Sequence, residues 1–508
     1  MNRLIYLIPI IFIGLLSCKK NETYESDAEI LSNWNYSSES YLKDSTLYIT
    51  KLVSLWQENI HPKNINDLVD SVKVRRFTKE FDMAEDVLDN LIQMTPQDPA
   101  TREPIDRFSF LDRQGVVNEE IQNARSISYG LYVFYLQTPE SEKDNADLYI
   151  RMVDLNSPAY IAGLRRGDRI LSINGDTKYD YITQYSQNFR GINQALSSKS
   201  MTIKWKKPNG QEMEKSIISA EYSIDPILSN WTNTIGNKKV GYFALSSFLS
   251  LTKVEQDDDD KDVVTLTKLH SDLEKLFNKY ESEGVKELII DLRYNGGGAT
   301  ATAEYLANKL VPSSATNKRM YYYKLNPFVS QELGDAFPAV NFNKNGNLSL
   351  SKVYFLVTNS TASASELLIN SLKPYMDVQV IGSENTYGKP VGFWGIPIGK
   401  KGNRADLFVT SFQMFNSANF GDYFNGLAPN KLTKEDYFKD FGDEEEGFIA
   451  EAIYHIKNGS YSSAGRSALA AKDLHRINNT HLLKFINSNR VSDLGMFKFS
   501  TQKLKLTK

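Results

Sequence analysis

The feature that most constrains the fold is a short run of apolar residues in the second half of the chain. Residues 288–293 read Leu-Ile-Ile-Asp-Leu-Arg. A strand with one face in water alternates apolar and polar side chains, whereas a continuous apolar run is typical of a strand covered on both faces in a partly parallel sheet. Residues 240–247, 353–357 and 378–381 also predict strands, and a helix is expected at 264–280. Strands that alternate with helices predict an α/β core, which we place at residues 223–458.

Two regions with different hydrophobic patterns precede this core. Residues 31–125 carry apolar side chains at helical spacing and predict a small helical domain. Residues 126–222 instead contain short runs that predict β-strands. The chain is therefore expected to be a multidomain protein of mixed α/β and α+β class, with a polar tether at 19–30 and a polar tail at 459–508. The expected strands of the second region are 131–136, 148–153, 170–173 and 201–205.

The first 18 residues predict an export signal. Arg3 precedes an apolar run at residues 4–16, which is shorter than the roughly 20 residues that a membrane span needs. The run ends in Leu15-Leu16-Ser17-Cys18, which resembles a bacterial lipobox. That resemblance implies cleavage before Cys18, lipidation of this cysteine, and an anchor in the bacterial envelope, with the outer membrane facing the periplasm as the expected location. A plain secretory signal or an uncleaved anchor is the alternative.

Composition excludes several classes of function. The formal net charge of -3 provides no basic excess for a nucleic-acid backbone. Cys18 is the single cysteine, so a lipidated chain has neither a disulfide nor a catalytic thiol. The run Asp257-Asp258-Asp259-Asp260 lacks the spacing of a calcium loop and is interpreted as a solvated loop. No cluster has metal-ligand spacing, so we predict neither metal nor cofactor.

The segment from Ser157 to Gly175 has a distinctive order of elements. A short helix is expected to end at Gly163, a turn follows at Gly167-Asp168, and Asn174-Gly175 predicts a tight hairpin turn. This order resembles the PDZ family. The resemblance implies binding of a peptide's C-terminal segment along a sheet edge, with the carboxylate on the loop Tyr129-Gly130-Leu131. A PDZ-shaped spacer without a ligand is the alternative.

Three motifs of the core carry the candidate chemistry. Residues 291–298 (Asp-Leu-Arg-Tyr-Asn-Gly-Gly-Gly) predict a strand that enters a glycine turn, which suits an anion or oxyanion site. Residues 358–366 place Ser363 at a helix start, where a serine is usually only a cap. Residues 382–392 form a glycine-flanked loop with Lys389, and such a lysine alone is usually a surface residue. Each motif by itself is weak evidence.

In this order and spacing, the three motifs resemble the S41 family of serine peptidases, the C-terminal processing and tail-specific proteases. The resemblance extends to residues 426–430 (Gly-Leu-Ala-Pro-Asn), a late landmark of that family. It implies a ClpP/crotonase-like core in which Ser363 is the nucleophile and Lys389 the general base. The backbone N–H of Ala364, with that of Gly296 or Gly297, would form the oxyanion hole.

The implied chemistry sets a requirement on the lysine. Serine is a weak nucleophile without a base, and lysine is a base only when neutral, so burial must lower its pKa from about 10.4. Many members of the family have a glutamine four residues after the lysine to orient it, whereas this chain has Phe393. Glu384 or Asn385 is the expected substitute, unless the dyad acts alone. The five histidines lie far from the motifs and no Gly-x-Ser-x-Gly elbow is present, which disfavours a histidine triad.

The expected substrates are unfolded or C-terminally exposed envelope proteins. Two alternatives remain open. One is a catalytically weak or inactive lipoprotein that binds peptides or other ligands on the same fold, and the other is a structural scaffold. The sequence makes no prediction about the oligomeric state.

Overall fold

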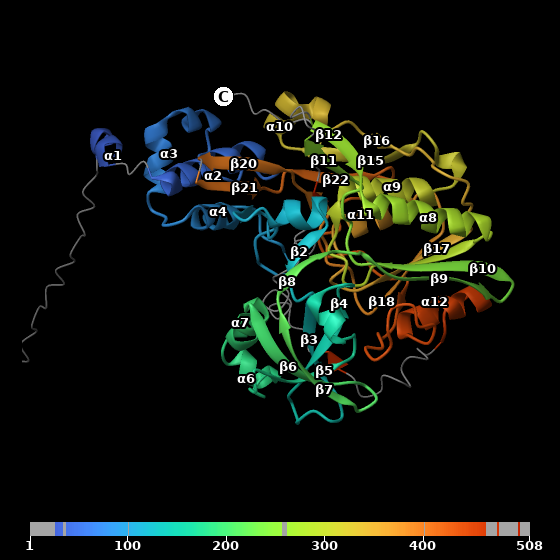
Figure 1. The fold of residues 1–508 in the computed structure, drawn as a ribbon. Helices are drawn as coiled ribbons and strands as arrows, with labels where there is room; N and C mark the ends of the chain where they lie inside the picture. Colours follow the sequence, from blue (N-terminus) through green and yellow to red (C-terminus); the bar gives the residue numbers. More distant parts are fainter. Residues whose placement is uncertain are drawn as a thin grey trace, which may run out of the picture.

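The computed structural model describes residues 26–33, 37–99, 101–256, 262–400, 402–463, 475–476 and 496–497. The lipidation candidate Cys18, the predicted signal and most of the predicted tail therefore lie outside the described residues. Within the described part, no helix is long and apolar enough to cross a membrane. Figure 1 shows three bodies: blue helices, a blue-green β domain, and a larger layered core.

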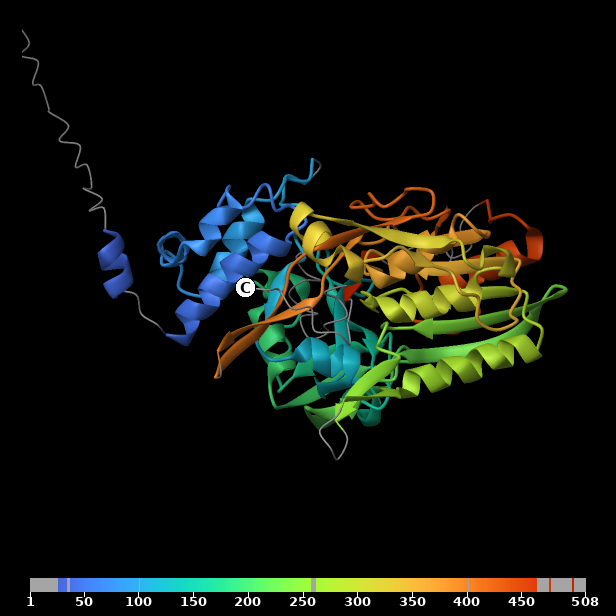
Figure 2. The same cartoon turned by 90° about the horizontal axis from the view of Figure 1, so that it is seen from above.

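The N-terminal region is helical, as its apolar spacing predicts. Leu47 and Leu52 are buried on α2, and Leu88 and Leu91 are buried on α4. The helices are α1 (Asp27–Asn33), α2 (Ser38–Val53), α3 (Ser71–Thr78) and α4 (Ala84–Gln93). Strand β1 (Phe110–Asp112) then pairs with β21 (Asn403–Phe408), which forms a hairpin with β20 (Gly395–Lys400). This orange hairpin reaches from the core to the blue helices and ties the two regions together (Figure 2).

The second region is a six-stranded sheet with the order β24-β3-β4-β5-β6-β7. The four strands expected there are all present. Ser157 caps α5 (Pro158–Ala162), and Gly163 ends that helix in the left-handed region. Asn174 and Gly175 both have positive φ, as a two-residue hairpin turn requires. The elements are β2 (Arg125–Ser128), β3 (Leu131–Gln137), β4 (Asp147–Val153), β5 (Arg169–Ile173), α6 (Tyr181–Tyr185), α7 (Arg190–Ser197), β6 (Ser200–Lys206), β7 (Glu212–Ile218), β8 (Ala220–Ser223) and β24 (His475–Arg476).

The core contains a second six-stranded sheet with the order β23-β18-β17-β13-β10-β9. The strands from β23 to β10 are parallel, and β9 is antiparallel to β10. They are β9 (Ile227–Ile235), β10 (Lys238–Leu245), β13 (Glu287–Asp291), β17 (Lys352–Val357), β18 (Val378–Gly382) and β23 (Lys431–Leu432). Helices α8 (Lys268–Ser282), α9 (Thr300–Leu310) and α11 (Ala364–Leu372) lie over one face, and α12 (Gly447–Asn458) lies over the other (Figure 1).

Both faces of β13 are buried, which explains the three consecutive apolar residues Leu288, Ile289 and Ile290. Leu288 and Ile290 pack in the cluster that contains α8, α9 and α11, whereas Ile289 packs in the cluster that contains α12. A parallel sheet with helices on both faces needs apolar residues on both sides of each strand. The α/β core predicted from this run is confirmed.

The core also carries smaller sheets around the carboxyl ends of the parallel strands. Strands β11 (Thr252–Gln256) and β12 (Asp262–Leu266) form a hairpin, so the helix expected from residue 264 begins only at Lys268. The side chain of Thr267 accepts from His270 N and caps that helix, which fixes its later start. The other elements are β14 (Gly298–Ala299), β15 (Arg319–Leu325), α10 (Pro327–Leu333), β16 (Val340–Asn341), β19 (Val391–Gly392), β22 (Phe412–Asn416) and β25 (Met496–Phe497).

Candidate active site

Ser363 occupies a strained position between β17 and α11. Its φ of 65° and ψ of -112° lie outside the usual regions for a residue with a side chain. The residue is fully buried, and its Oγ has no hydrogen-bond partner among the described residues and does not cap the helix. Backbone strain and an unsatisfied buried hydroxyl both cost free energy, and such costs gather at functional sites. The simple interpretation of Ser363 as a helix cap therefore does not account for its geometry.

Lys389 lies in the loop between β18 and β19 and is also buried. Burial lowers its pKa to about 7, although the charges of Asp106 and Glu366 act in the opposite direction. Two aromatic rings lie near the amine: Nζ is 4.3 Å from the ring centroid of Phe393 and 4.9 Å from that of Phe108. At this pKa a large fraction of the amine is neutral near pH 7, which is the form that can act as a base.

Glu366 joins these two residues. Its Oε2 accepts from the backbone N–H of Ser363 at 2.7 Å and from that of Lys389 at 2.8 Å. Its Oε1 accepts from Thr386 Oγ1 at 2.5 Å and from Gly388 N at 2.8 Å. Burial raises the pKa of the carboxyl, whereas these four donors favour its charged form. One side chain thereby holds the serine turn against the lysine loop.

Glu366 received no role in the sequence analysis, although a signal for it exists. A Glu three residues after Ser363 matches the capping-box spacing, in which the carboxylate bonds the N-cap N–H. That local bond is present. Its bonds to Thr386, Gly388 and Lys389 join positions more than 19 residues away in the chain, and no local pattern indicates them.

The glycine turn approaches the serine closely. A Cβ added at Gly297 would lie 2.9 Å from Ser363 Cβ and 3.1 Å from Ala364 N, and the φ of this glycine is 116°. Asn295 shapes the turn, because its Oδ1 accepts from Gly297 N at 3.0 Å and its backbone O accepts from Ala362 N. The N–H of Gly297, which is one of the predicted oxyanion donors, therefore already donates a hydrogen bond to Asn295 within the turn. Ala364 is the first residue of α11, where backbone N–H groups lack partners within the helix.

The two residues expected to orient the lysine lie in the same loop. Asn385 is exposed, and its side chain donates to Asn425 O at 3.1 Å. Glu384 is half-buried. Groups near the amine also come from the N-terminal region, where Asp106 is buried beside Phe108. Neither of these two residues could be assigned to the site from the sequence, because nothing local connects them with a loop about 280 positions later.

The PDZ-like domain contacts the glycine turn through arginine side chains. Arg166 donates to Tyr294 Oη at 3.1 Å and pairs with Glu435 at 2.7 Å, and all three side chains are buried. The Arg151 guanidinium lies 4.9 Å from the ring centroid of Tyr294. Tyr294 is two residues before Gly296, so the β domain touches the turn next to the candidate oxyanion site.

The predicted carboxylate loop Tyr129-Gly130-Leu131 leads into β3. Gly130 has a φ of 65°, and its N–H donates to Ser128 Oγ. Tyr129 is buried, and its backbone O accepts from Ala159 N. The loop therefore stands beside α5 at the start of β3, which pairs with β4 on one side and, at its far end, with β24 on the other.

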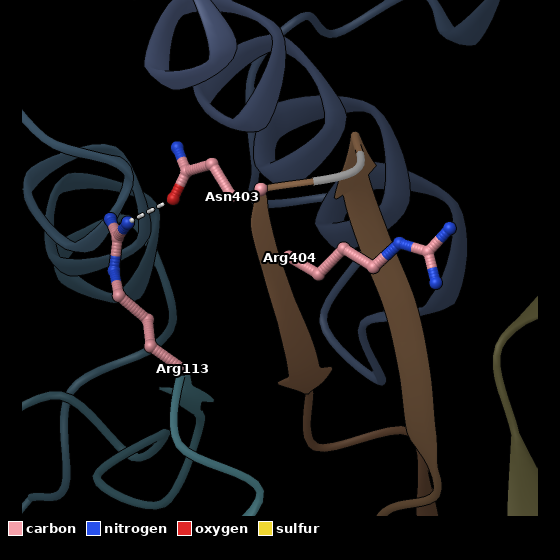
Figure 3. A pocket seen from close by; sticks show the side chains of 4 residues that line it. Arg113, Asn403 and Arg404 are labelled. Atoms are coloured by element: carbon pink, nitrogen blue, oxygen red, sulfur yellow. Dashed lines mark hydrogen bonds between the residues drawn. The ribbon is translucent and has the colours of Figure 1, made fainter.

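A separate pocket lies at the helical region and includes neither residue of the dyad. It is lined by Arg113, Gly402, Asn403 and Arg404 (Figure 3). Arg113 pairs with Glu39 and Glu85 and donates to Asn403 Oδ1 at 3.2 Å. These bonds tie α2 and α4 to β21, so the pocket is part of the structural connection between the helices and the hairpin.

Comparisons with known proteins agree with the motifs. Residues 239–430 match the model of peptidase family S41, and residues 149–187 match a PDZ domain model. The carboxy-terminal processing protease CtpB of Bacillus subtilis (strain 168) is 21% identical over 360 residues, which are 67% of this chain and 65% of that protein. A "Probable CtpA-like serine protease" of Staphylococcus aureus (strain N315) is 27% identical over 256 residues, which are 50% of this chain and 44% of the relative.

The fold has a solved counterpart. A crystal structure named "Putative S41 protease", from Bacteroides fragilis NCTC 9343, superposes with a TM-score of 0.59 at 23% identity, and covers 84% of this chain and all of that chain. The resemblance to S41 peptidases with a PDZ domain is thus confirmed. The chain spans less than two thirds of the length of the two curated relatives.

Proposed function

We propose that the protein is a serine endopeptidase in which Ser363 is the nucleophile and Lys389 the general base. One observation carries this proposal: Glu366 accepts hydrogen bonds from the backbone N–H groups of both Ser363 and Lys389. It thereby holds together a strained, buried serine and a buried lysine whose pKa is about 7. The S41 relatives support a protease function for such a core.

The reaction follows the logic of a serine triad with lysine in place of histidine. The neutral amine of Lys389 takes the proton of Ser363 Oγ while Oγ attacks the substrate carbonyl carbon. The tetrahedral oxyanion is held by the N–H of Ala364 together with that of Gly296, because the N–H of Gly297 already donates to Asn295 Oδ1. The ammonium of Lys389 then protonates the leaving amine as the C–N bond breaks. Water hydrolyses the resulting ester, with Lys389 again as the base.

The proposal extends to substrates and location. The PDZ-like domain would bind the C-terminal segment of an unfolded or exposed envelope protein at the edge near Tyr129-Gly130-Leu131. Its contact with Tyr294 supports a path from that edge to the dyad. Lipidation at Cys18 would anchor the enzyme in the bacterial envelope, with the periplasmic face of the outer membrane as the proposed location.

The test is digestion of an unstructured tagged protein, with the products identified by mass spectrometry. Ser363→Ala and Lys389→Ala should each abolish cleavage. The matched controls Ser383→Ala and Lys318→Ala change exposed residues and should retain activity. Full activity of Ser363→Ala would refute the assignment. A serine-reactive probe that labels wild type but not Ser363→Ala supports it, whereas an unlabelled wild type favours a binding protein on this fold.

A further inference from the structure

Two short segments from late in the chain pair with the two places where a peptide is expected to bind. Strand β24 is antiparallel to the end of β3, with His475 opposite Gln137 and Arg476 opposite Leu136. Strand β25 is parallel to β14, with Met496 opposite Gly298 and Phe497 opposite Ala299. Addition of an extended segment to a sheet edge is a common mode of peptide recognition.

Strand β25 lies between the two sides of the candidate active site. On one side it pairs with Gly298, the neighbour of the glycine that contacts Ser363. On the other side Phe497 forms a bridge with Phe393, whose ring is near Lys389 Nζ. The backbone of this segment therefore pairs with both sides of the candidate active site.

The side chain of Phe497 fills an aromatic pocket. It is 1% exposed, and its ring centroid lies 5.1 Å from that of Phe393 and 5.4 Å from that of Phe408. Phe110 completes the group, because it stacks on Phe408 at 4.9 Å and meets Phe393 edge-on. Such a pocket selects a large apolar side chain, since only that kind of side chain buries apolar area without leaving a polar group unpaired.

We propose that the segment Met496–Phe497 occupies the substrate cleft in cis, and that the pocket of Phe110, Phe393 and Phe408 is a subsite for a large apolar substrate side chain. This inference rests on the proposed peptidase function. A tethered segment competes with a substrate for the cleft at a high effective concentration. It therefore lowers the activity toward other chains until it is displaced. Phe393 then has two functions, as a neighbour of the lysine and as a wall of this subsite.

The kinetic test changes Phe497 in the full chain. Phe497→Ala should raise kcat/KM toward a peptide substrate with an aromatic residue by about tenfold or more, mainly through a lower KM, because a competitor in cis is lost. Phe497→Leu should stay close to wild type. Phe420→Ala removes an exposed phenylalanine and is the matched control without effect. If Phe497→Ala leaves kcat/KM unchanged or reduces it while the chain remains folded by circular dichroism, Phe497 is only a core residue and the inference is wrong.

A binding test separates this inference from the proposed function, because it needs no catalysis. A labelled peptide with the sequence of residues 490–500 is titrated into the full-length Ser363→Ala chain with and without Phe497→Ala. The doubly substituted chain should bind the peptide, and the singly substituted chain should bind it at least tenfold more weakly. A peptide with Asp in place of the phenylalanine should not bind. Equal or absent binding in both chains overturns the inference. If the binding difference is found but wild type does not cleave the unstructured tagged protein, only the peptidase assignment is overturned.

Discussion

The backbone N–H groups of Ser363 and Lys389 donate to the same carboxylate oxygen, Oε2 of Glu366. The two residues are 26 positions apart and belong to different loops of the parallel sheet. A single buried carboxylate therefore holds the backbone of the strained serine turn and the backbone of the lysine loop in place. Glu366 therefore organises the proposed dyad without a role in the proposed proton transfer.

Glu366→Gln tests this positioning role. The amide replaces one acceptor oxygen by an NH₂ group, which would face N–H or O–H donors and leave them unpaired in a buried site. We expect kcat to fall about 100-fold with little change in KM, because displacement of the catalytic groups by about 1 Å has an effect of that size. The control Glu332→Gln changes an exposed glutamate and should match wild type. A kcat of Glu366→Gln within about threefold of wild type would contradict the role.

The depressed pKa of Lys389 predicts the pH dependence of both activity and stability. If the neutral amine is the base, as proposed, kcat/KM should rise with pH and reach half of its limit near pH 7. The unfolded chain has a lysine pKa of about 10.4, so between pH 7 and about 10.4 the unfolded state binds more protons than the folded one. The contribution of this group to the free energy of unfolding therefore increases with pH across that window.

Lys389→Met isolates this contribution, since other groups titrate equally in both proteins. At pH 6 the inactive variant should be more stable than wild type, by on the order of a few kcal/mol, and the difference should shrink as the pH approaches 10. Denaturant unfolding at pH 6, 8 and 10 measures it, with the exposed Lys318→Met as control. A stability difference that does not depend on pH would show that Lys389 has an ordinary pKa.

Gly297→Ala tests the close approach of the glycine turn. The new Cβ would stand 2.9 Å from Ser363 Cβ at a φ of 116°, so the turn or the serine must shift. We expect a loss of kcat of about 10²–10³-fold, because the shift would displace the neighbouring oxyanion donors of Gly296 and Ala364, and loss of one such donor has an effect of this size. Gly210→Ala is the matched control, because Gly210 has a φ of 90° but no atom of the described residues lies within 4 Å of an added Cβ. If both variants lose the same stability and neither loses kcat, the positive φ alone explains why position 297 is a glycine.

Much of the fold was predictable from local pattern. The strands at β3, β4, β5 and β6, the cap at Gly163 and the buried run of β13 follow from side-chain period and turn chemistry, and the structure contains them all. The start of α8 was misplaced by four residues, because the apolar residues Val263, Val264 and Leu266 suit a hairpin strand as well as a helix. Short apolar runs of this kind do not distinguish the two structures.

The sequence by itself determined which residues stand at the ends of the strands: Ser363 at a helix start, Lys389 in a glycine-flanked loop, and Gly297 in a turn. Only the tertiary structure decided what surrounds them. Asp106 and Phe108 reach the lysine from the N-terminal region, Glu366 joins the two loops, and Phe497 fills the aromatic pocket. The physical reason is that backbone geometry follows from neighbours in the chain, whereas the pKa of a buried amine and the occupancy of a cleft depend on groups brought together by folding.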